Sequence, residues 1–108
     1  MDTPRLGQTG HHILLALAAE ERHGYGIMKQ VLLDTDGELH LGPATLYTTI
    51  KRLLDQKLIE ESGERADKEL GDSRRRYYKL TGSGAKALQE EAARAQRFLK
   101  VVSERCAA

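Results

Sequence analysis

One short stretch near the middle of the chain combines hydroxyls, cations and a phenol at the spacing of a single helical face. Pro43 follows Gly42, and proline suits the first position of a helix because its φ is fixed and no N–H is left unpaired. Leu46, Ile50 and Leu53 then fall on one apolar face at about 100° per residue. The other face carries Ala44, Thr45, Thr48, Lys51, Arg52 and Asp55, with Tyr47 at its border.

This polar face has the chemistry needed to contact a nucleic-acid duplex. Short side chains let a helix backbone approach the edges of bases in the major groove, and lysine and arginine side chains bind phosphates. An ordinary amphipathic helix with a solvated polar face has the same pattern. The stretch alone therefore leaves both interpretations open.

No other pattern in the sequence indicates catalysis or metal binding. The histidines at positions 11, 12, 23 and 40 lack the paired spacing of a zinc site, and the one cysteine, Cys106, is far from them. No nucleophile lies in a recognisable turn, and no glycine-rich phosphate loop follows a strand. We therefore expect no enzymatic activity, no cofactor and no metal.

Length and charge further limit the kinds of protein to which this chain could belong. A chain of 108 residues fits one domain with a modest core and little room for an enzyme cleft. The net charge of +1 is low for a nucleic-acid binder, but Lys51-Arg52 and Arg74-Arg75-Arg76 concentrate positive charge. A single cysteine cannot form an internal disulfide, and no segment has the pattern of a signal peptide or membrane span. We therefore expect a cytoplasmic protein.

The elements that would position these groups can be read from periodicity and turn signals. Thr9 is expected to cap the first helix, and His23 lies in the cap region of the second. The expected order is helix 11–20, helix 24–33, short strand 38–41, helix 43–54, strand 58–62, loop 63–72 and strand 74–80. Three helices followed by a two-stranded hairpin are typical of a winged helix-turn-helix.

The hairpin would form the wing and place four cations beside the third helix. These are Arg74, Arg75, Arg76 and Lys79. Alternation along the strand puts Arg75 and Tyr77 on one face and Arg76 and Tyr78 on the other. The cations could reach phosphates or a minor groove. The alternative is a solvated strand end whose charge protects a sheet edge.

A long last helix is predicted over 82–105, with Thr81 as its cap. Its apolar residues, alternately three and four apart, are Ala85, Leu88, Ala92, Ala95, Leu99, Val102 and Cys106. Such a helix is about 36 Å long, more than a small winged domain can cover. We therefore expect dimerisation through Leu88, Ala92, Ala95, Leu99 and Val102. The alternative is packing against the first helix alone.

These features predict a mainly α-helical α+β fold, a winged helix-turn-helix followed by a long C-terminal dimerisation helix. Residues 1–8 would form an N-terminal arm, 9–80 the DNA-binding domain and 81–108 the dimerisation helix. Several motifs occur in a characteristic order: His23-Gly24-Tyr25-Gly26-Ile27-Met28, Leu41-Gly42-Pro43-Ala44-Thr45-Leu46-Tyr47, Lys51-Arg52-Leu53, Leu58-Ile59-Glu60, and Arg75-Arg76-Tyr77-Tyr78-Lys79-Leu80-Thr81 with Gly84. In this combination the chain, over about 13–88, resembles the PadR family of transcriptional regulators.

The resemblance implies a cytoplasmic dimer, mostly acting as a repressor, which in some members releases DNA on binding phenolic acids or aromatic drugs. The single short C-terminal helix resembles the smaller subfamily. The positions that match DNA-contacting positions of the family are Tyr25 and Lys29 on the second helix, Thr45, Tyr47, Thr48, Lys51 and Arg52 on the third, and Arg75 and Tyr77 on the wing.

Two positions depart from the family pattern. Gly26 stands where an acidic residue is common, so any pairing made there is absent. Lys57 stands where glycine often ends the recognition helix, so it must turn without the freedom of glycine or the helix must end differently.

The resulting hypothesis is a homodimeric, sequence-specific repressor whose partners are double-stranded DNA, a second copy of itself and a small aromatic or phenolic inducer, with no membrane partner. Phe98 is the candidate ligand residue, at an interface where Phe98, Leu99, Ile13 and Leu17 could meet; the alternative is that these are plain core residues. Two other functions remain open at this stage: a winged-helix protein-interaction module without DNA binding, and a small-molecule carrier.

Overall fold

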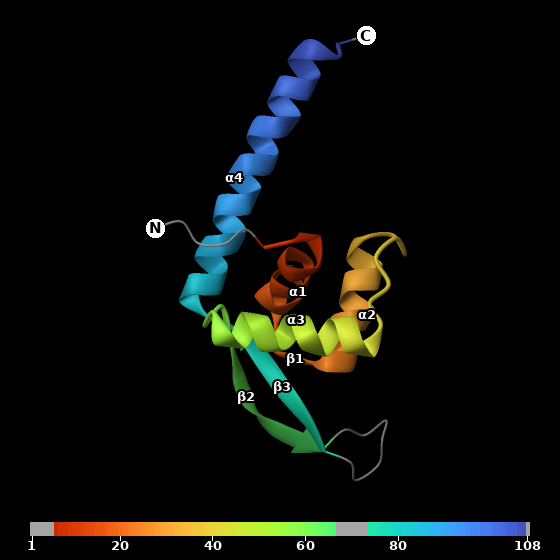
Figure 1. The fold of residues 1–108 in the computed structure, drawn as a ribbon, viewed down its shortest axis with the longest axis vertical. Helices are drawn as coiled ribbons and strands as arrows, with labels where there is room; N and C mark the ends of the chain where they lie inside the picture. The colour runs from red at the N-terminus through yellow and green to blue at the C-terminus, as the bar shows by residue number, and fades with distance from the viewer. Residues whose placement is uncertain (1–5, 67–73, 108) are drawn as a thin grey trace.

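The computed structural model describes residues 6–66 and 74–107 (Figure 1). Within them, helices pack against one end of a small antiparallel sheet with the strand order β1-β3-β2, and the hairpin of β2 and β3 extends away from them (Figure 1). The elements are α1 (Gln8–Ala19), β1 (Arg22–His23), α2 (Gly24–Asp34), α3 (Pro43–Asp55), β2 (Ile59–Ala66), β3 (Arg74–Leu80) and α4 (Gly82–Arg105). The prediction of a mainly helical winged helix-turn-helix with a long last helix is confirmed.

The core lies where α1, α2 and α3 meet the inner end of the sheet. Leu46, Ile50 and Leu53 of α3 are at most 2% exposed, so the apolar face predicted for this helix is confirmed. Each such side chain contributes about 1.5–3 kcal/mol when fully buried. The remaining buried members are Ile13, Leu14, Ala16, Leu17, Ile27, Val31, Leu41, Leu58, Ile59 and Tyr78.

The third strand of the sheet is not where the sequence suggested. The segment 38–41 forms no strand; the Leu39 N–H is instead bonded to Thr35 Oγ1 at 2.9 Å, which satisfies it within the turn. The third strand is β1, the two residues between α1 and α2, and it pairs His23 with Tyr77. A two-residue strand carries no periodicity, so no pattern could have revealed it.

The wing is longer than expected. Strand β2 continues to Ala66, four residues beyond the predicted end, because a bulge between Glu61 and Gly63 restores the pairing with β3. Gly63 adopts φ +113°, which glycine reaches without strain. The rest of the predicted loop, 67–72, lies outside the described residues.

The first helix begins earlier than predicted. Gly7, not Thr9, is the N-cap residue of α1, and no side chain caps this end. Leu6 packs against the core and against Gly10, so the chain has already turned into the helix by Gln8. Gln8 therefore belongs to the helix rather than to the predicted arm, and residues 1–5 of that arm are not described.

The turn after α3 resolves the alternatives left open by Lys57. Lys57 adopts φ 61°, so it makes the left-handed turn without being glycine. The turn is closed by Lys57 N–H donating to the Leu54 carbonyl and Leu58 N–H donating to the Leu53 carbonyl, each at 3.0 Å. These two bonds offset a conformational cost of about 1 kcal/mol.

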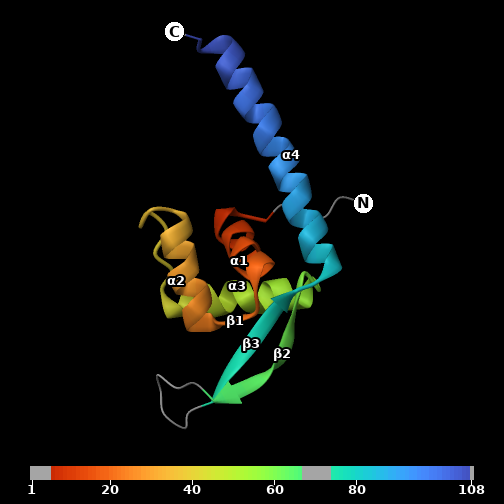
Figure 2. The same cartoon turned by 180° about the vertical axis from the view of Figure 1, so that it is seen from behind.

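Helix α4 is anchored at its start and uncovered at its end. Thr81 Oγ1 accepts the Gly84 N–H at 3.1 Å and donates to the Lys57 carbonyl at 2.8 Å, which confirms the predicted cap. His11 Nε2 and Glu91 Oε2, a pair of atoms 3.0 Å apart, connect α1 to α4. Beyond this pair α4 extends away from the other elements (Figures 1 and 2). Among the described helices, none is both long and apolar enough to cross a membrane.

The contact at Gly84 gives the first testable prediction. In a Gly84→Ala variant the new Cβ would overlap the Leu58 carbonyl oxygen and lie 2.6 Å from Leu80 Cδ1, so backbone must move. We expect the free energy of unfolding to fall by about 1–3 kcal/mol in urea denaturation. Gly82→Ala adds the same methyl group where nothing lies within 4 Å and should leave stability unchanged. Equal stabilities of the two variants would contradict the close contact.

Candidate nucleic-acid interface

The polar face of α3 lies on the outside of the molecule. Thr45, Thr48, Lys51 and Arg52 are all exposed. Neither of the two cations forms an ion pair with any residue that the structure describes. The Thr49 hydroxyl bonds back to the Thr45 carbonyl at 2.8 Å, so it faces its own helix rather than solvent. The face therefore presents hydroxyls and unpaired positive charge, as the sequence indicated.

Tyr47 differs from the other polar residues of α3 because its phenol reaches across to α2. A Cβ added at Gly24 would lie only 2.6 Å from the Tyr47 hydroxyl and 3.0 Å from Cζ. Gly24 thus provides the space in which the end of the tyrosine ring packs, although the side chain as a whole is still half exposed. Tyr47 therefore holds α3 against the start of α2 as well as facing solvent.

Beside α3, α2 and the hairpin bring rings and cations together in an aromatic–cation cluster, which we define as His23, Tyr25, Lys29, Arg75 and Tyr77. The Tyr25 ring has Lys29 Nζ 5.4 Å and Arg75 Cζ 5.1 Å from its centroid. The rings of His23 and Tyr77 meet edge to face at 5.2 Å. Cations are attracted electrostatically to the face of an aromatic ring, so these contacts hold the cluster together around Tyr25.

Two other cations of the hairpin, Arg76 and Lys79, are paired with acids. Arg76 lies 3.4 Å from Glu61, and Lys79 lies 3.3 Å from Glu60. Arg75, on the opposite face of β3, instead contacts His23 and Tyr25. The wing therefore presents Arg75 toward α2, whereas Arg76 and Lys79 form ion pairs with β2 across the hairpin.

Between α2, α3 and β3 lies a cavity of about 370 Å³. Its walls are formed by His23, Gly24, Tyr25, Tyr47, Arg75, Arg76 and Tyr78. Burial raises the pKa of the Tyr78 phenol above its usual 10.0, and the nearby Arg76 guanidinium opposes that rise. Tyr78 therefore stays protonated at neutral pH, and Arg75 and Arg76 supply the charged groups of the cavity wall.

The chain matches the transcriptional regulator PadR-like family over residues 13–90. It belongs to this family. No curated protein sequence matches the chain at a significant level. The family consists of transcriptional regulators, which agrees with the winged fold and with the cations exposed beside α3.

Solved structures of similar fold include two clostridial proteins. A transcriptional regulator from Clostridium thermocellum is 25% identical, with a TM-score of 0.71 over 88% of this chain and 89% of that one. A PadR family transcription regulator from Clostridium difficile is 27% identical, with a TM-score of 0.70 over 94% and 100%. Bacillus subtilis PadR in complex with operator DNA shares the fold at 20% identity, with a TM-score of 0.68 over 82% and 48%.

Helix α4 of this PadR-like chain carries an uncovered apolar face. Leu99 is 64% and Val102 38% exposed, and Ala92 and Ala95 are also exposed, whereas Leu88 is partly buried against the core. Packing against α1 alone therefore covers only the first of the apolar residues predicted to form the dimer interface. A hollow of about 420 Å³ continues the face onto α1; its walls are formed by His11, His12, Leu15, Leu88, Gln89, Glu91, Ala92 and Ala95.

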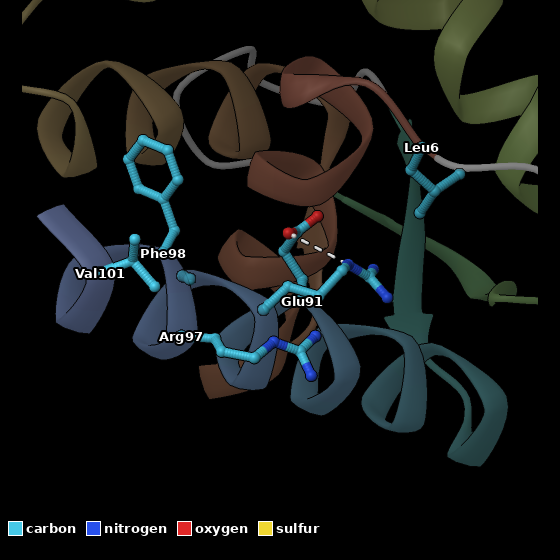
Figure 3. A pocket seen from close by; sticks show the side chains of 7 residues that line it. Leu6, Glu91, Arg97, Phe98 and Val101 are labelled. Atoms are coloured by element: carbon cyan, nitrogen blue, oxygen red, sulfur yellow. Dashed lines mark ion pairs between the residues drawn. The ribbon is translucent and has the colours of Figure 1, made fainter.

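The candidate ligand residue Phe98 is 73% exposed and projects from α4 (Figure 3). It borders an open hollow of about 740 Å³ whose other walls are Leu6, Glu91, Arg94, Ala95, Arg97 and Val101. Ile13 and Leu17 are at most 3% exposed in the core. The idea that they meet Phe98 at an interface is therefore wrong, and for these two residues the plain-core alternative holds.

Three residues that border the aromatic–cation cluster or the hollows were not identified from the sequence. Arg65 stacks over the Tyr77 ring at 4.4 Å and pairs with Glu21, but it lay in a segment assigned to a loop. Leu15 borders the hollow between α1 and α4, but it lies outside the helical face formed by the buried residues Ile13, Leu14 and Leu17. His23 was recognised only as a helix cap, because its contacts with β3 are distant in sequence. In the described ranges no group of three or more potential ligands could hold a metal ion.

The packing of Tyr47 on Gly24 gives a second prediction. Gly24→Ala should push the Tyr47 ring out of the cavity wall, which would shift the ring signals in aromatic NMR spectra. The loss in stability should be about 1 kcal/mol, at the low end for overpacking because a side chain moves more easily than backbone.

Gly26→Ala is the matched control, in the same turn of α2. Its added Cβ would meet His23 Cε1 at 3.4 Å, an ordinary contact, so the Tyr47 signals should stay in place. Unchanged Tyr47 signals in Gly24→Ala would show that the ring does not pack there.

Proposed function

We propose that this PadR-like chain is a homodimeric repressor that binds a specific DNA sequence through α3 and the hairpin β2–β3. The observation that carries the proposal is the unpaired polar face of α3 lying next to the aromatic–cation cluster. The operator complex of Bacillus subtilis PadR, which shares this fold, supports DNA as the partner.

The residues divide by the part of the duplex that each can reach. Thr45 and Thr48 are short and exposed on α3, so they suit contacts to base edges in the major groove. Lys51 and Arg52 lie further along the same face and suit phosphates on its border. Lys29, Tyr25, Arg75 and Tyr77 suit the phosphate backbone beside the groove, and Tyr47 supports the joint between α2 and α3.

Dimerisation is supported by the apolar face that α4 leaves in water. Leu99, Val102 and the small Ala92 and Ala95 form a seam at which two helices can approach closely. A dimer would then present two α3 helices to half-sites about one helical turn, near 34 Å, apart. The single C-terminal helix agrees with the smaller PadR subfamily.

We also propose that binding of a small aromatic or phenolic compound releases the protein from DNA. A ligand acts as a switch only if it favours one dimer geometry over another. The hollow beside Phe98 is open in the single chain and has one aromatic and several apolar walls. A second α4 packed nearby would enclose it and make ligand binding depend on how the two helices sit.

The DNA proposal can be tested by fluorescence anisotropy with DNA from upstream of the protein's own gene and a scrambled control, at two salt concentrations. We expect at least roughly tenfold preference for the upstream DNA and a steep salt dependence. Lys51→Ala should weaken binding to both DNAs and lower the salt slope by about one, whereas Thr48→Ala should change the base preference.

Lys100→Ala removes the same charge from the far part of α4 and should leave binding unchanged. A Thr48→Ala variant with unaltered preference would show that another part of the protein reads the bases. No binding to either DNA at low salt would instead favour a protein-interaction module.

The dimer can be tested by sedimentation velocity. Leu99→Glu places a charge in the proposed seam and should turn dimer into monomer at micromolar concentration, since burying an unpaired carboxylate costs several kcal/mol. Because Leu99 is 64% exposed in the single chain, the fold of the monomer should be retained. Ala93→Glu, on the opposite side of α4, should remain dimeric; dissociation of both variants would place the interface elsewhere.

A further inference from the structure

We propose that His23 is a positioning residue that holds Arg75 in place for a DNA phosphate. This inference rests on the proposed function, and it gives His23 a role beyond that of a helix cap. The feature that carries it is a single ring nitrogen, His23 Nδ1, shared by two donors that come from different parts of the fold.

The two donors are a backbone amide and a guanidinium. The Gly26 N–H donates to Nδ1 at 2.9 Å, which caps α2, and Arg75 Nη1 lies 3.1 Å from the same nitrogen. Neither group can accept a hydrogen bond, because a backbone N–H and a guanidinium only donate. Nδ1 must therefore act as the acceptor in both contacts, which requires its lone pair.

The ring of His23 also lies beside the two tyrosine rings of the cluster. It meets Tyr77 edge to face at 5.2 Å and lies nearly parallel to Tyr25 at 6.4 Å. The backbones of His23 and Tyr77 are paired in the sheet. His23 thus connects the start of α2 to the face of the wing that carries Arg75.

The consequence for binding is pre-organisation. A free arginine loses much side-chain entropy when it is fixed on a phosphate. Arg75 is already held between the His23 ring and the face of Tyr25, 5.1 Å from that ring's centroid. The side-chain entropy that Arg75 loses on binding a phosphate should therefore be smaller than for a mobile arginine, as long as residue 23 provides the acceptor.

Two substitutions separate positioning from capping. Serine and asparagine are both good N-cap residues, so either should bond the Gly26 N–H and keep α2 stable. Asparagine places its Oδ1 close to the position of histidine Nδ1 and can also accept from Arg75. Serine is too short to reach the guanidinium.

We expect His23→Ser to unfold like the unsubstituted protein but to bind the preferred DNA roughly tenfold more weakly, with a salt slope lowered by about one. His23→Asn should bind within about threefold of the unsubstituted protein. In an Arg75→Gln background, His23→Ser should cost nothing further, because the two residues act together. Anisotropy titrations at several salt concentrations measure the unsubstituted protein, the three single variants and the double variant.

Several results would overturn the inference. They are full binding by His23→Ser, equal weakening by His23→Asn and His23→Ser, and additive losses with Arg75→Gln. A DNA-independent check is the ¹⁵N NMR spectrum of His23 in the free protein, where a proton on Nδ1 would contradict the geometry. If the unsubstituted protein prefers no DNA, the proposed function fails, while this spectrum still decides the role of the His23 acceptor.

Discussion

The contact between Gly84 and the Leu58 carbonyl determines how α4 is placed relative to α3. Leu58 ends the turn after α3, and its carbonyl also accepts the Thr81 N–H at 3.1 Å. Because residue 84 lacks a side chain, the first turn of α4 can lie directly on this turn. The angle between the polar face of α3 and the apolar face of α4 is therefore set by close backbone packing.

Much of the fold follows from local sequence patterns that agree with the packing of the core. The apolar spacing of Leu46, Ile50 and Leu53 identified the buried face of α3, and Pro43 and Thr81 marked where helices begin. The exposed polar residues of the candidate site could be foreseen for the same reason, since the face opposite a buried stripe must meet solvent. Their roles in DNA binding remain a proposal.

The features that sequence reasoning missed depend on contacts distant along the chain. Strand β1 exists because β3 pairs with it, and the bulge at Gly63 prolongs β2 by matching it to β3. The separation of Arg75 from Arg76 depends on which neighbour each face meets, His23 on one side and Glu61 on the other. A run of arginines looks uniform in sequence, but the folded sheet gives Arg75 and Arg76 different neighbours.

The uncovered end of α4 links the order of this helix to the abundance of the protein. Isolated helical segments are marginal in water, and tertiary packing normally supplies the missing stability. Around Leu99 and Val102 the single chain supplies little such packing. In the proposed dimer a second α4 would supply this packing, so the stability of the last turns would depend on the concentration of the protein. A regulator built in this way would respond to its own cellular level, with a threshold set by the dissociation constant of the pair.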